Sequence, residues 1–299
     1  MSDKTCMGAG IFNLDIVASK EGKELTTIIE EVGGTCGNVM AILAHMGCHT
    51  YPVARLDDSD FGQKITDDLR NFGCDTTYVT NSADGGTTLL NVVHKTDKDG
   101  NHKVSVRASG PQGGRFPNYR FILKERAQQI LDTVSFTPDV FFFDSPNAGH
   151  RILAEGLGVK GTLVYFEPGT SKGNDILKSI EVSHIVKFSD ETIADLSFLE
   201  GFHNKLFIQT MGANGIRFKL KDNEWIHLPA VKNDKAVDWE GAGDWTTSTF
   251  INYLISNNHL NIDTLTVEIV TNALNAAQAM ASQSVSYMGS KGLIHAQRK

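Results

Sequence analysis

Short apolar runs that alternate with helix-like segments are the feature that most limits the fold of this chain. Four such runs are rich in β-branched and aromatic residues, as is typical of strands buried on both faces. They cover residues 140–143, 162–166, 185–188 and 206–210. The segments 148–156 and 191–199 between them fit helices. This alternation predicts an α/β fold with a mainly parallel central sheet and helices on both faces.

The first part of the chain continues the pattern. A strand is expected at about residues 4–11, and one helix is predicted over residues 38–45, ended by Gly47. A second helix carries an apolar stripe over residues 61–72 and ends at Gly73. Glycine is the usual residue just beyond a helix. We expect a single domain over residues 1–299.

One region interrupts the alternation with further β-structure. Residues 87–94 and 102–107 are strand-like and flank residues 97–100, where Asp-Gly is a strong hairpin signal. An extended segment at about residues 16–32 precedes the first helix. We expect these insertions, about 16–32 and 87–107, to form a small β-sheet lid that excludes water from a site below it. A surface hairpin without such a role is the alternative.

A glycine-rich turn between carboxylates is the most informative motif. Asp238-Trp239-Glu240-Gly241-Ala242-Gly243-Asp244 stands directly before a helical pattern. Residues 241–243 are therefore expected at the N-terminal turn of a helix, where unpaired N–H groups and the macrodipole attract phosphate. A carboxylate at Asp244, beside a bound phosphate, is electrostatically unfavourable unless it has a function. One such function is to accept a proton from a hydroxyl that attacks phosphorus. A helix start capped by Asp is the alternative.

Polar residues early in the chain are candidates for binding a polyol. Asn13 and Asp15 follow the first strand, and alternate residues of an extended segment point the same way. A buried carboxylate there can accept hydrogen bonds from two sugar hydroxyls. Gly33 and Gly34 precede a helix, in which Asn38 either serves as a cap or binds the polyol.

A second glycine-containing turn, Thr210-Met211-Gly212-Ala213-Asn214-Gly215, ends a buried strand. The carboxyl edge of a parallel sheet is where ligands bind, so Thr210 and Gly212 could meet phosphate. A plain turn into the next strand is compatible with this. The chain has no Walker A sequence, and Asn13 replaces the third glycine of a dinucleotide-binding motif.

Composition excludes several classes of function. The 299 residues are 40% hydrophobic and 21% charged, which is ordinary for a globular protein. With a net charge of −7 and no basic run, neither nucleic acid nor a membrane is an expected partner. Four cysteines without Cys-x-x-Cys spacing, and a start without an apolar stretch, favour a cytoplasmic protein with reduced thiols.

Taken in order, these motifs resemble the ribokinase-like, or PfkB-type, carbohydrate kinases. The family's Gly-Gly-x-x-x-Asn block corresponds to residues 33–38, and residues 56–62 are similar to its Gly-x-Asp-x-x-Gly region. Thr210-x-Gly212 and the block at 238–244 follow. The resemblance covers nearly the whole chain. It implies a ribokinase-like three-layer fold whose lid often forms a homodimer interface.

The resemblance also implies an activity and the residues that carry it out. The activity is transfer of the γ-phosphoryl group of ATP to a hydroxyl of a small sugar, with Mg²⁺ and often K⁺. Asp244 would be the catalytic base, with Gly241, Ala242 and Gly243 as the anion hole. The sugar would be held by Asn13, Asp15, Gly33, Gly34 and Asn38. The nucleotide would be met by Thr210, Gly212, Gly215 and Asn275. Asp238 would help to bind the monovalent cation.

Several residues depart from the family pattern. Trp239 stands where threonine is frequent, so the cation loop is expected to be altered. Arg55 stands near a usual glycine and could reshape the sugar end. The family's Asn-x-x-Glu motif, which organises metal-bound water, is replaced by residues 189–192, in which Asp190 or Glu191 could take its role.

Other functions stay open at this point. A nucleoside kinase of the same fold would need an aromatic pocket, which Phe12 and Phe116 could supply. A non-catalytic ligand-binding or regulatory member is favoured by the changed Asn-x-x-Glu region and opposed by the intact Asp244. A nucleotide-dependent enzyme outside the family is a third possibility. The sequence does not identify the sugar; Arg107 and Arg115 either meet an acidic substrate or are solvated.

Overall fold

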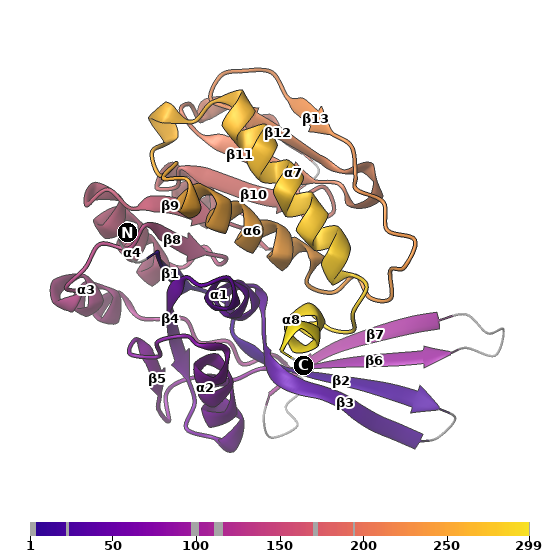
Figure 1. Ribbon diagram of the computed structural model, residues 1–299. Helices are drawn as coiled ribbons and strands as arrows, with labels where there is room; N and C mark the ends of the chain where they lie inside the picture. The colour runs from indigo at the N-terminus through magenta and orange to yellow at the C-terminus, as the bar shows by residue number, and fades with distance from the viewer. Residues whose placement is uncertain are drawn as a thin grey trace.

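A nine-stranded sheet forms the centre of the molecule, and a second sheet of four strands projects from it (Figure 1). The structure is a computed structural model that describes residues 4–21, 24–96, 102–110, 116–169, 173–193 and 195–298. The order of the large sheet is β13-β12-β11-β10-β9-β8-β1-β4-β5. Neighbours from β5 to β11 are parallel, whereas β12 and β13 are antiparallel. The expected α/β fold is confirmed.

The strands of the large sheet are short, and the central ones are buried on both faces. The runs predicted at 140–143, 162–166, 185–188 and 206–210 are β8 to β11. The strands are β1 (Thr5–Ala9), β4 (His49–Leu56), β5 (Val79–Asn81), β8 (Val140–Phe143), β9 (Leu163–Phe166), β10 (Ile185–Ser189), β11 (Leu206–Thr210), β12 (Ile216–Leu220) and β13 (Ile226–Leu228).

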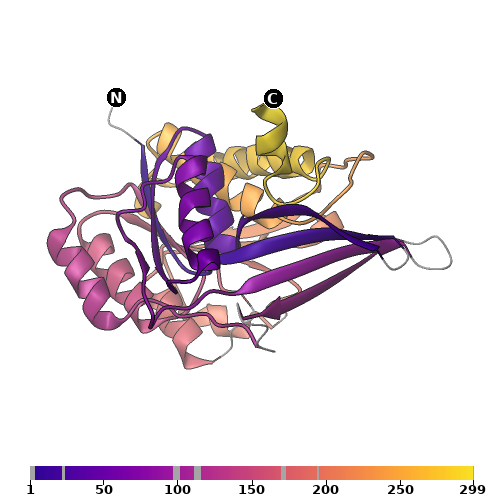
Figure 2. The same ribbon diagram turned by 90° about the horizontal axis from the view of Figure 1, so that it is seen from below.

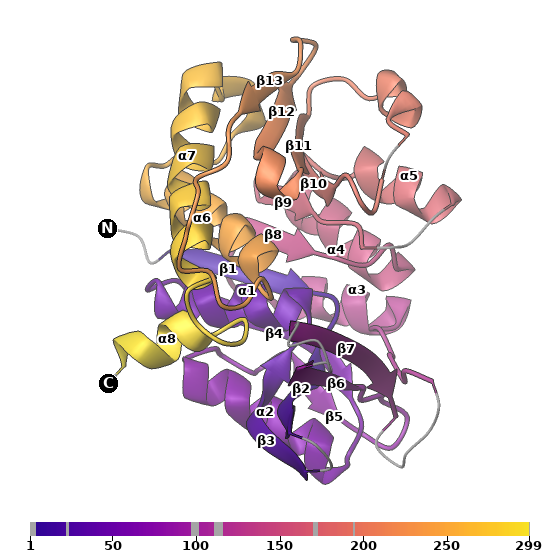
Figure 3. The same cartoon turned by 90° about the vertical axis from the view of Figure 1, so that its right-hand side faces the viewer.

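Helices pack on both faces of this sheet (Figure 3). Each face has its own cluster of buried apolar side chains. One face carries α1 (Thr35–His45), α2 (Asp60–Phe72), α6 (Ala242–Ser256), α7 (Val267–Ser284) and α8 (Gly292–Gln297). The other carries α3 (Lys124–Thr133), α4 (Ala148–Val159) and α5 (Asn174–Glu181). None of the helices in the described part of the chain is long and apolar enough to cross a membrane.

The helix predicted over residues 191–199 is wrong. The described residues after β10 form a turn, followed by the short 3₁₀ segment η1 (Ser197–Gly201). The Ser189 hydroxyl accepts a hydrogen bond from the N–H of Thr192 (3.2 Å), and the Asp195 carboxylate accepts one from the N–H of Ser197 (2.9 Å). Such local side-chain bonds compete with helix formation. Two further 3₁₀ segments are η2 (Gly212–Asn214) and η3 (Ile262–Thr264).

The second sheet extends away from the body as an arm (Figure 2). Its order is β3 (Glu24–Gly33), β2 (Asn13–Glu21), β6 (Leu89–Thr96) and β7 (His102–Ser109). β2 and β3 form one antiparallel hairpin, β6 and β7 another, and β2 runs parallel to β6. The small separate sheet predicted from about 16–32 and 87–107 is confirmed. The predicted turn at 97–100 and Arg115 lie outside the described residues.

A buried carboxylate fixes the junction between the two sheets. Asp144, directly after β8, accepts hydrogen bonds from the N–H groups of Ile11 (2.9 Å) and Cys36 (2.8 Å). Ile11 joins β1 to β2, and Cys36 lies in the first turn of α1. Gly10 leaves the space for this contact, because a Cβ there would lie 2.1 Å from the carboxylate of Asp144. The start of the small sheet is thereby tied to the large one.

Replacing Asp144 tests this junction. Asp144→Ala leaves the N–H groups of Ile11 and Cys36 without their acceptor, at about 1–3 kcal/mol for each one that stays buried. We expect urea unfolding to show a loss of that size in the free energy of unfolding. Asp132→Ala, at an exposed position on α3, is the control and should change it by no more than about 0.5 kcal/mol. Equal stability of the two variants would exclude the junction role.

Candidate active site

Strand direction brings polar side chains together at one edge of the large sheet. The carboxyl ends of β8, β9 and β10 are followed by Asp144, Glu167 and Asp190, and β11 ends at Thr210. This is the edge at which parallel α/β sheets bind ligands. The N-terminus of α6 lies at the same edge, because a Cβ built on Gly243 would be 3.7 Å from Nζ of Lys187, in β10.

The first turn of α6 is suited to an anion. Gly241 is the N-cap at φ +77°, and a Cβ there would lie 2.5 Å from that of Ser290. Only glycine meets both conditions without strain. The N–H groups of Gly243 and Asp244 lack intrahelical acceptors at this position, and Gly243 is exposed. The predicted N-terminal turn at 241–243 is confirmed, and it offers donors to a phosphate-like group.

The carboxylate of Asp244 is partly buried in this turn. It does not cap the helix, since the cap is Gly241. Its Oδ2 accepts a hydrogen bond from Nδ2 of Asn38 at 2.7 Å. Burial, followed by the negative charge of Glu167, raises the pKa of Asp244 to about 7, although Asn38 and nearby lysines act in the opposite direction. A carboxylate of that pKa can accept a proton efficiently near neutral pH.

A buried ion pair lies beside the turn. The ammonium of Lys187, which is 2% exposed, pairs with the carboxylate of Glu167. The other oxygen of Glu167 accepts a hydrogen bond from the hydroxyl of Thr247 at 2.6 Å. Since Lys187 also approaches Gly243, its charge is placed to attract a phosphoryl group. Sequence reasoning missed both residues, although a lysine inside an apolar run and a carboxylate just after one were available signals.

Asn38 has a different environment from the one expected. It lies within α1 and does not cap it, because the cap is Gly34. Its Oδ1 accepts hydrogen bonds from Nζ of Lys291 (2.6 Å) and Oγ of Ser290 (3.1 Å). Its Nδ2 donates to Asp244. The amide is therefore engaged by protein groups at both ends.

The other residues expected to hold a polyol lie where β2 and β3 leave the body. Asn13 and Asp15 are buried, and the amide of Asn13 donates to the carboxylate of Asp15. Gly33 pairs with Asn13 across the hairpin, and a Cβ there would come within 1.9 Å of the Asp15 carboxylate. Gly34 has φ +80°, and a Cβ there would lie 2.5 Å from the carbonyl oxygen of Ile11. Burial raises the pKa of Asp15.

The residues expected to meet the nucleotide come from β11, its following turn and α7. Thr210 ends β11 and Gly212 is exposed just beyond it. Gly215 has a packing role, because a Cβ there would lie 2.2 Å from the carbonyl oxygen of Leu228. Asn275 is exposed on α7, which packs against α6.

Two exposed carboxylates could serve magnesium. Asp190 and Glu191 directly follow β10, and the N–H of Asp190 donates to the carbonyl of Thr210 at 3.0 Å. Mg²⁺ keeps several waters and needs only one or two carboxylates, so this pair fits an ion that arrives with a nucleotide. Within the described residues, no group of three or more His, Cys, Asp and Glu side chains could hold a metal ion.

Asp238 is less suited to a monovalent cation. Its side chain is buried, and its two oxygens accept hydrogen bonds from the N–H groups of Glu240 (3.1 Å) and Gly289 (2.8 Å). The bond from Gly289 joins the loop before α6 to the turn before α8. Each carboxylate oxygen thus accepts one hydrogen bond from the protein.

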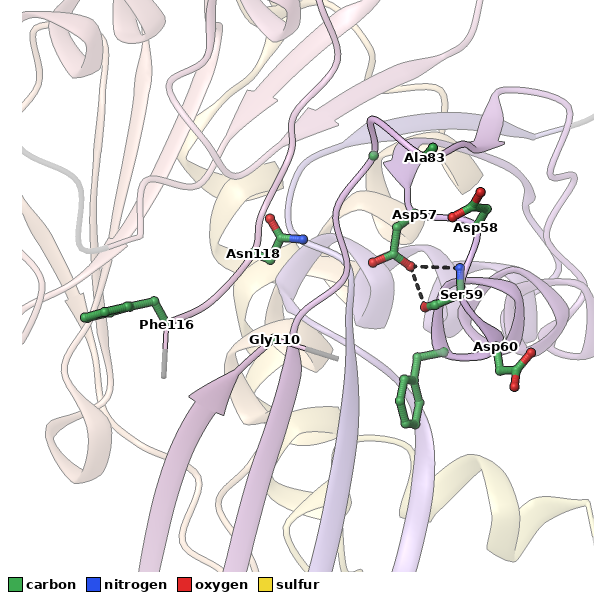
Figure 4. A pocket seen from close by; sticks show the side chains of 10 residues that line it. Asp57, Asp58, Ser59, Asp60, Ala83, Gly110, Phe116 and Asn118 are labelled. Atoms are coloured by element: carbon green, nitrogen blue, oxygen red, sulfur yellow. Dashed lines mark hydrogen bonds between the residues drawn. The ribbon is translucent and has the colours of Figure 1, made fainter. Parts of the chain in front are cut away.

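A cavity of about 560 Å³ opens beside the base of the small sheet (Figure 4). Asp57 is fixed there by the hydroxyls of Ser59 and Thr87. Phe12 does not line this cavity; it is 4% exposed and lines a second, much smaller pocket with Tyr119 and Phe121. The lining consists of residues 57–61, Ala83, Gly85, Gly110, Phe116 and Asn118. It includes neither Asp15 nor Asp244, so the cavity does not contain the catalytic candidate.

Two arginines noted in the sequence have defined positions near this region. Arg55 forms an ion pair with Asp84 at 2.9 Å and so holds the loop that borders the cavity. Arg107 is exposed on β7.

Solved structures with the same fold are numerous. A fructokinase from Xylella fastidiosa with bound ATP has a TM-score of 0.73 and 18% identity, over 99% of this chain and 100% of that one. A ribokinase from Giardia lamblia has a TM-score of 0.72 and 15% identity, over 97% and 95%. A nucleoside kinase from Burkholderia thailandensis, in complex with inosine, has a TM-score of 0.66 and 17% identity, over 96% and 92%.

These identities establish the fold and leave the substrate open between sugars and nucleosides. None of the curated proteins matches the sequence significantly. The model of the PfkB family of carbohydrate kinases matches residues 179–296, which include β10, β11 and the whole motif at 238–244. The resemblance seen in the sequence is confirmed: residues 179–296 match the PfkB carbohydrate kinase family, and the whole chain has the ribokinase-like kinase fold.

Proposed function

We propose that this chain is an ATP-dependent kinase that transfers the γ-phosphoryl group to a hydroxyl of a small carbohydrate or sugar acid. One observation carries the proposal: the carboxylate of Asp244, with a pKa near 7, lies in the same helical turn as the free N–H groups of an anion site. Phosphoryl transfer needs these two parts, a proton acceptor and a positioned phosphate, within a few ångströms of each other. The ATP bound to the Xylella fastidiosa fructokinase supports ATP as the donor.

The reaction follows from the arrangement. The carboxylate of Asp244 takes the proton of the acceptor hydroxyl, whose oxygen forms a bond to the γ-phosphorus. The bond from that phosphorus to the bridging oxygen breaks, and ADP leaves with the electron pair. The N–H groups of Gly243 and Asp244 and the ammonium of Lys187 stabilise the negative charge on the transferring group. Magnesium bound to ATP would neutralise phosphate charge, and Asp190 and Glu191 would hold its water ligands.

The acceptor is assigned to the space between the small sheet and the first turn of α6. Asp15 and Asn13 would accept and donate hydrogen bonds to its hydroxyls, and the small sheet would act as a lid within a single kinase domain. Asp15 and Asn13 supply the carboxyl and amide groups that a polyol needs. This favours a carbohydrate as the acceptor.

A nucleoside kinase is the second candidate. The side chain of Phe116 is 82% exposed at the cavity beside the lid, where it offers a nucleobase a surface for stacking. Release of ADP, measured across a panel of sugars, sugar acids and nucleosides, separates the two. Absence of turnover with every acceptor would instead favour a non-catalytic ligand-binding member of the fold.

Asp244→Asn is the direct test of the catalytic base. The change keeps the shape and removes the proton acceptor, which is typically worth about 10²- to 10⁴-fold in rate. We expect kcat to fall by that factor, while the fold is kept and ATP binds equally or more tightly because a negative charge is gone. Asp234→Asn, on the exposed loop before the motif, is the matched control. A nearly normal kcat in Asp244→Asn would refute the assignment.

The pH dependence gives an independent check. Because the pKa of Asp244 is raised to about 7, kcat of the wild type should fall as the pH drops below that value. The free energy of unfolding depends on pH in the opposite direction. A raised carboxyl pKa contributes stability below about pH 4 that is lost as the pH rises through 7. The free energy of unfolding of Asp244→Asn, measured with urea, should therefore decline less between pH 4 and 7 than that of the wild type.

Asp15→Ala tests the acceptor site. Loss of its hydrogen bonds to substrate hydroxyls should raise KM for the acceptor by a factor equivalent to about 1–3 kcal/mol. KM for ATP should stay the same and serves as the internal control. An unchanged KM for the acceptor would show that Asp15 is structural and that the substrate binds elsewhere.

We also propose that two chains pair through their small sheets. Ile28 and Val106 are exposed apolar residues on this arm, and such surface favours association. Sedimentation velocity should show a homodimer that becomes a monomer when both residues are changed to Asp. Val159→Asp, at an exposed apolar position on α4, should leave the dimer intact. A monomeric wild type would contradict the proposal.

A further inference from the structure

Lys291 is a fully buried lysine directly before α8. Its Nζ donates hydrogen bonds to Oδ1 of Asn38 (2.6 Å) and Oγ of Ser290 (2.9 Å). A carboxylate oxygen of Glu31, in β3, lies 3.4 Å away. An ammonium has three donors, and these oxygens provide an acceptor for each. A buried charge of this kind is costly unless it is paired, so its neighbours are fixed by the need to compensate it.

The ammonium determines how Asn38 is oriented. Because Nζ of Lys291 can only donate, the amide oxygen of Asn38 must face it. The amide nitrogen then faces Asp244, and it donates to Oδ2 at 2.7 Å. A donor at this place requires an oxygen acceptor and favours the ionised carboxylate. Lys291 thus acts on Asp244 through one intervening side chain, and also through its charge.

The loop at Asp238, near which the family resemblance implies a monovalent cation, is hydrogen-bonded to the segment 285–290. The carbonyl of Ser290 accepts one from the indole N–H of Trp245 at 2.8 Å. The carbonyl of Val285 accepts from the N–H groups of Val237 (2.7 Å) and Asp238 (3.1 Å). The carboxylate of Asp238 accepts from two further N–H groups. A K⁺ ion at these oxygens would have to compete with the protein donors that already bond them.

We propose that the ammonium of Lys291 is a built-in cation that positions Asn38 and, through it, the carboxylate of Asp244, so that the chain works without an added monovalent cation. Lys291 is a positioning residue, because its ammonium is fully buried and is held by Asn38, Ser290 and Glu31. The inference rests on the proposed role of Asp244 as the base. It replaces the potassium ion implied by the family resemblance with a group of the chain itself.

The charges around Asp244 and Lys291 determine the direction in which the pKa of Asp244 changes when Lys291 is replaced. Glu167 after β9, Lys187 on β10 and Lys291 before α8 face Asp244, and Asn38 of α1 is its uncharged partner. Lys291 in turn faces Glu31, with further carboxyl groups at Asp15 and Glu240. His295, on α8, bonds the other oxygen of Glu31 at 2.7 Å. Removing the Lys291 charge therefore raises the pKa of Asp244.

The first experiment uses the unaltered protein. Thermal unfolding without ATP, and turnover with ATP and the acceptor found in the panel, are compared in KCl and in tetramethylammonium chloride at equal ionic strength. Tetramethylammonium is too large to be coordinated by the loop oxygens. We expect the thermal midpoint to agree within about 1 °C and kcat within about 2-fold, since no binding energy is gained. Stabilisation and faster turnover in KCl would overturn the inference.

The second experiment removes the charge. Lys291→Met and Lys291→Gln should each lower kcat, by about 10- to 100-fold if Asp244 loses its orientation. In both variants, the fall of kcat at low pH, which we call the acidic limb of the pH profile, should move to higher pH. Gln keeps a donor for Asn38 and is the variant to use if Met does not fold. Lys205→Met is the control, because that lysine donates to the carbonyls of Glu181 and Ser183 away from the site.

The outcomes separate this inference from the proposed function. If kcat is lower in both Lys291 variants but the acidic limb moves in neither, the role of Lys291 is purely structural and this inference is overturned. Lys205→Met should lose stability without moving the limb. If Asp244→Asn kept its turnover, the proposed function itself would fail, whatever Lys291 does. If Asp244→Asn is inactive while KCl activates the wild type, only the built-in cation is refuted.

Discussion

The direction of the parallel strands is the constraint on which the candidate site depends. Strands β1, β4, β8, β9, β10 and β11 all end at the same edge, so the polar residues that begin each loop must gather there. Glu167, Asp190 and Thr210 come from neighbouring strands, and the first turn of α6 lies beside them. The positive end of that helix is the natural counterpart of such an edge. The topology therefore favours an anion site at this place before any single residue is considered.

Charge compensation at this edge is incomplete. Buried ammonium groups at Lys187 and Lys291 each pair with a carboxylate, Glu167 and Glu31. Asp244 receives an amide donor and no direct ion pair among the described contacts, so burial and the charge of Glu167 raise its pKa to about 7. A carboxylate with a closer cation would be a weaker base. The same imbalance that costs stability at neutral pH leaves Asp244 able to accept a proton.

The sequence predicted the parts of the molecule that depend on local signals. Apolar runs gave β8 to β11, and the glycines at 241 and 243 gave the first turn of α6. The segment 191–199 has the composition of a helix, but side-chain bonds such as Ser189 to Thr192 and Asp195 to Ser197 override it. The partners of Lys291 could not be foreseen, since Asn38 lies more than 250 residues earlier in the chain. A lysine between Ser290 and Gly292 has the sequence context of an exposed turn.

A covalently held ammonium differs from a bound ion in how its burial is compensated. The cost of burying the Lys291 ammonium is compensated during folding by its contacts with Asn38, Ser290 and Glu31. This compensation does not depend on the concentration of a monovalent cation. One oxygen of Asp238 joins its loop to the turn before α8 through the N–H of Gly289, and the other accepts from Glu240 within the loop. Trp239 is 71% exposed, so its bulk is directed to solvent and does not fill the loop.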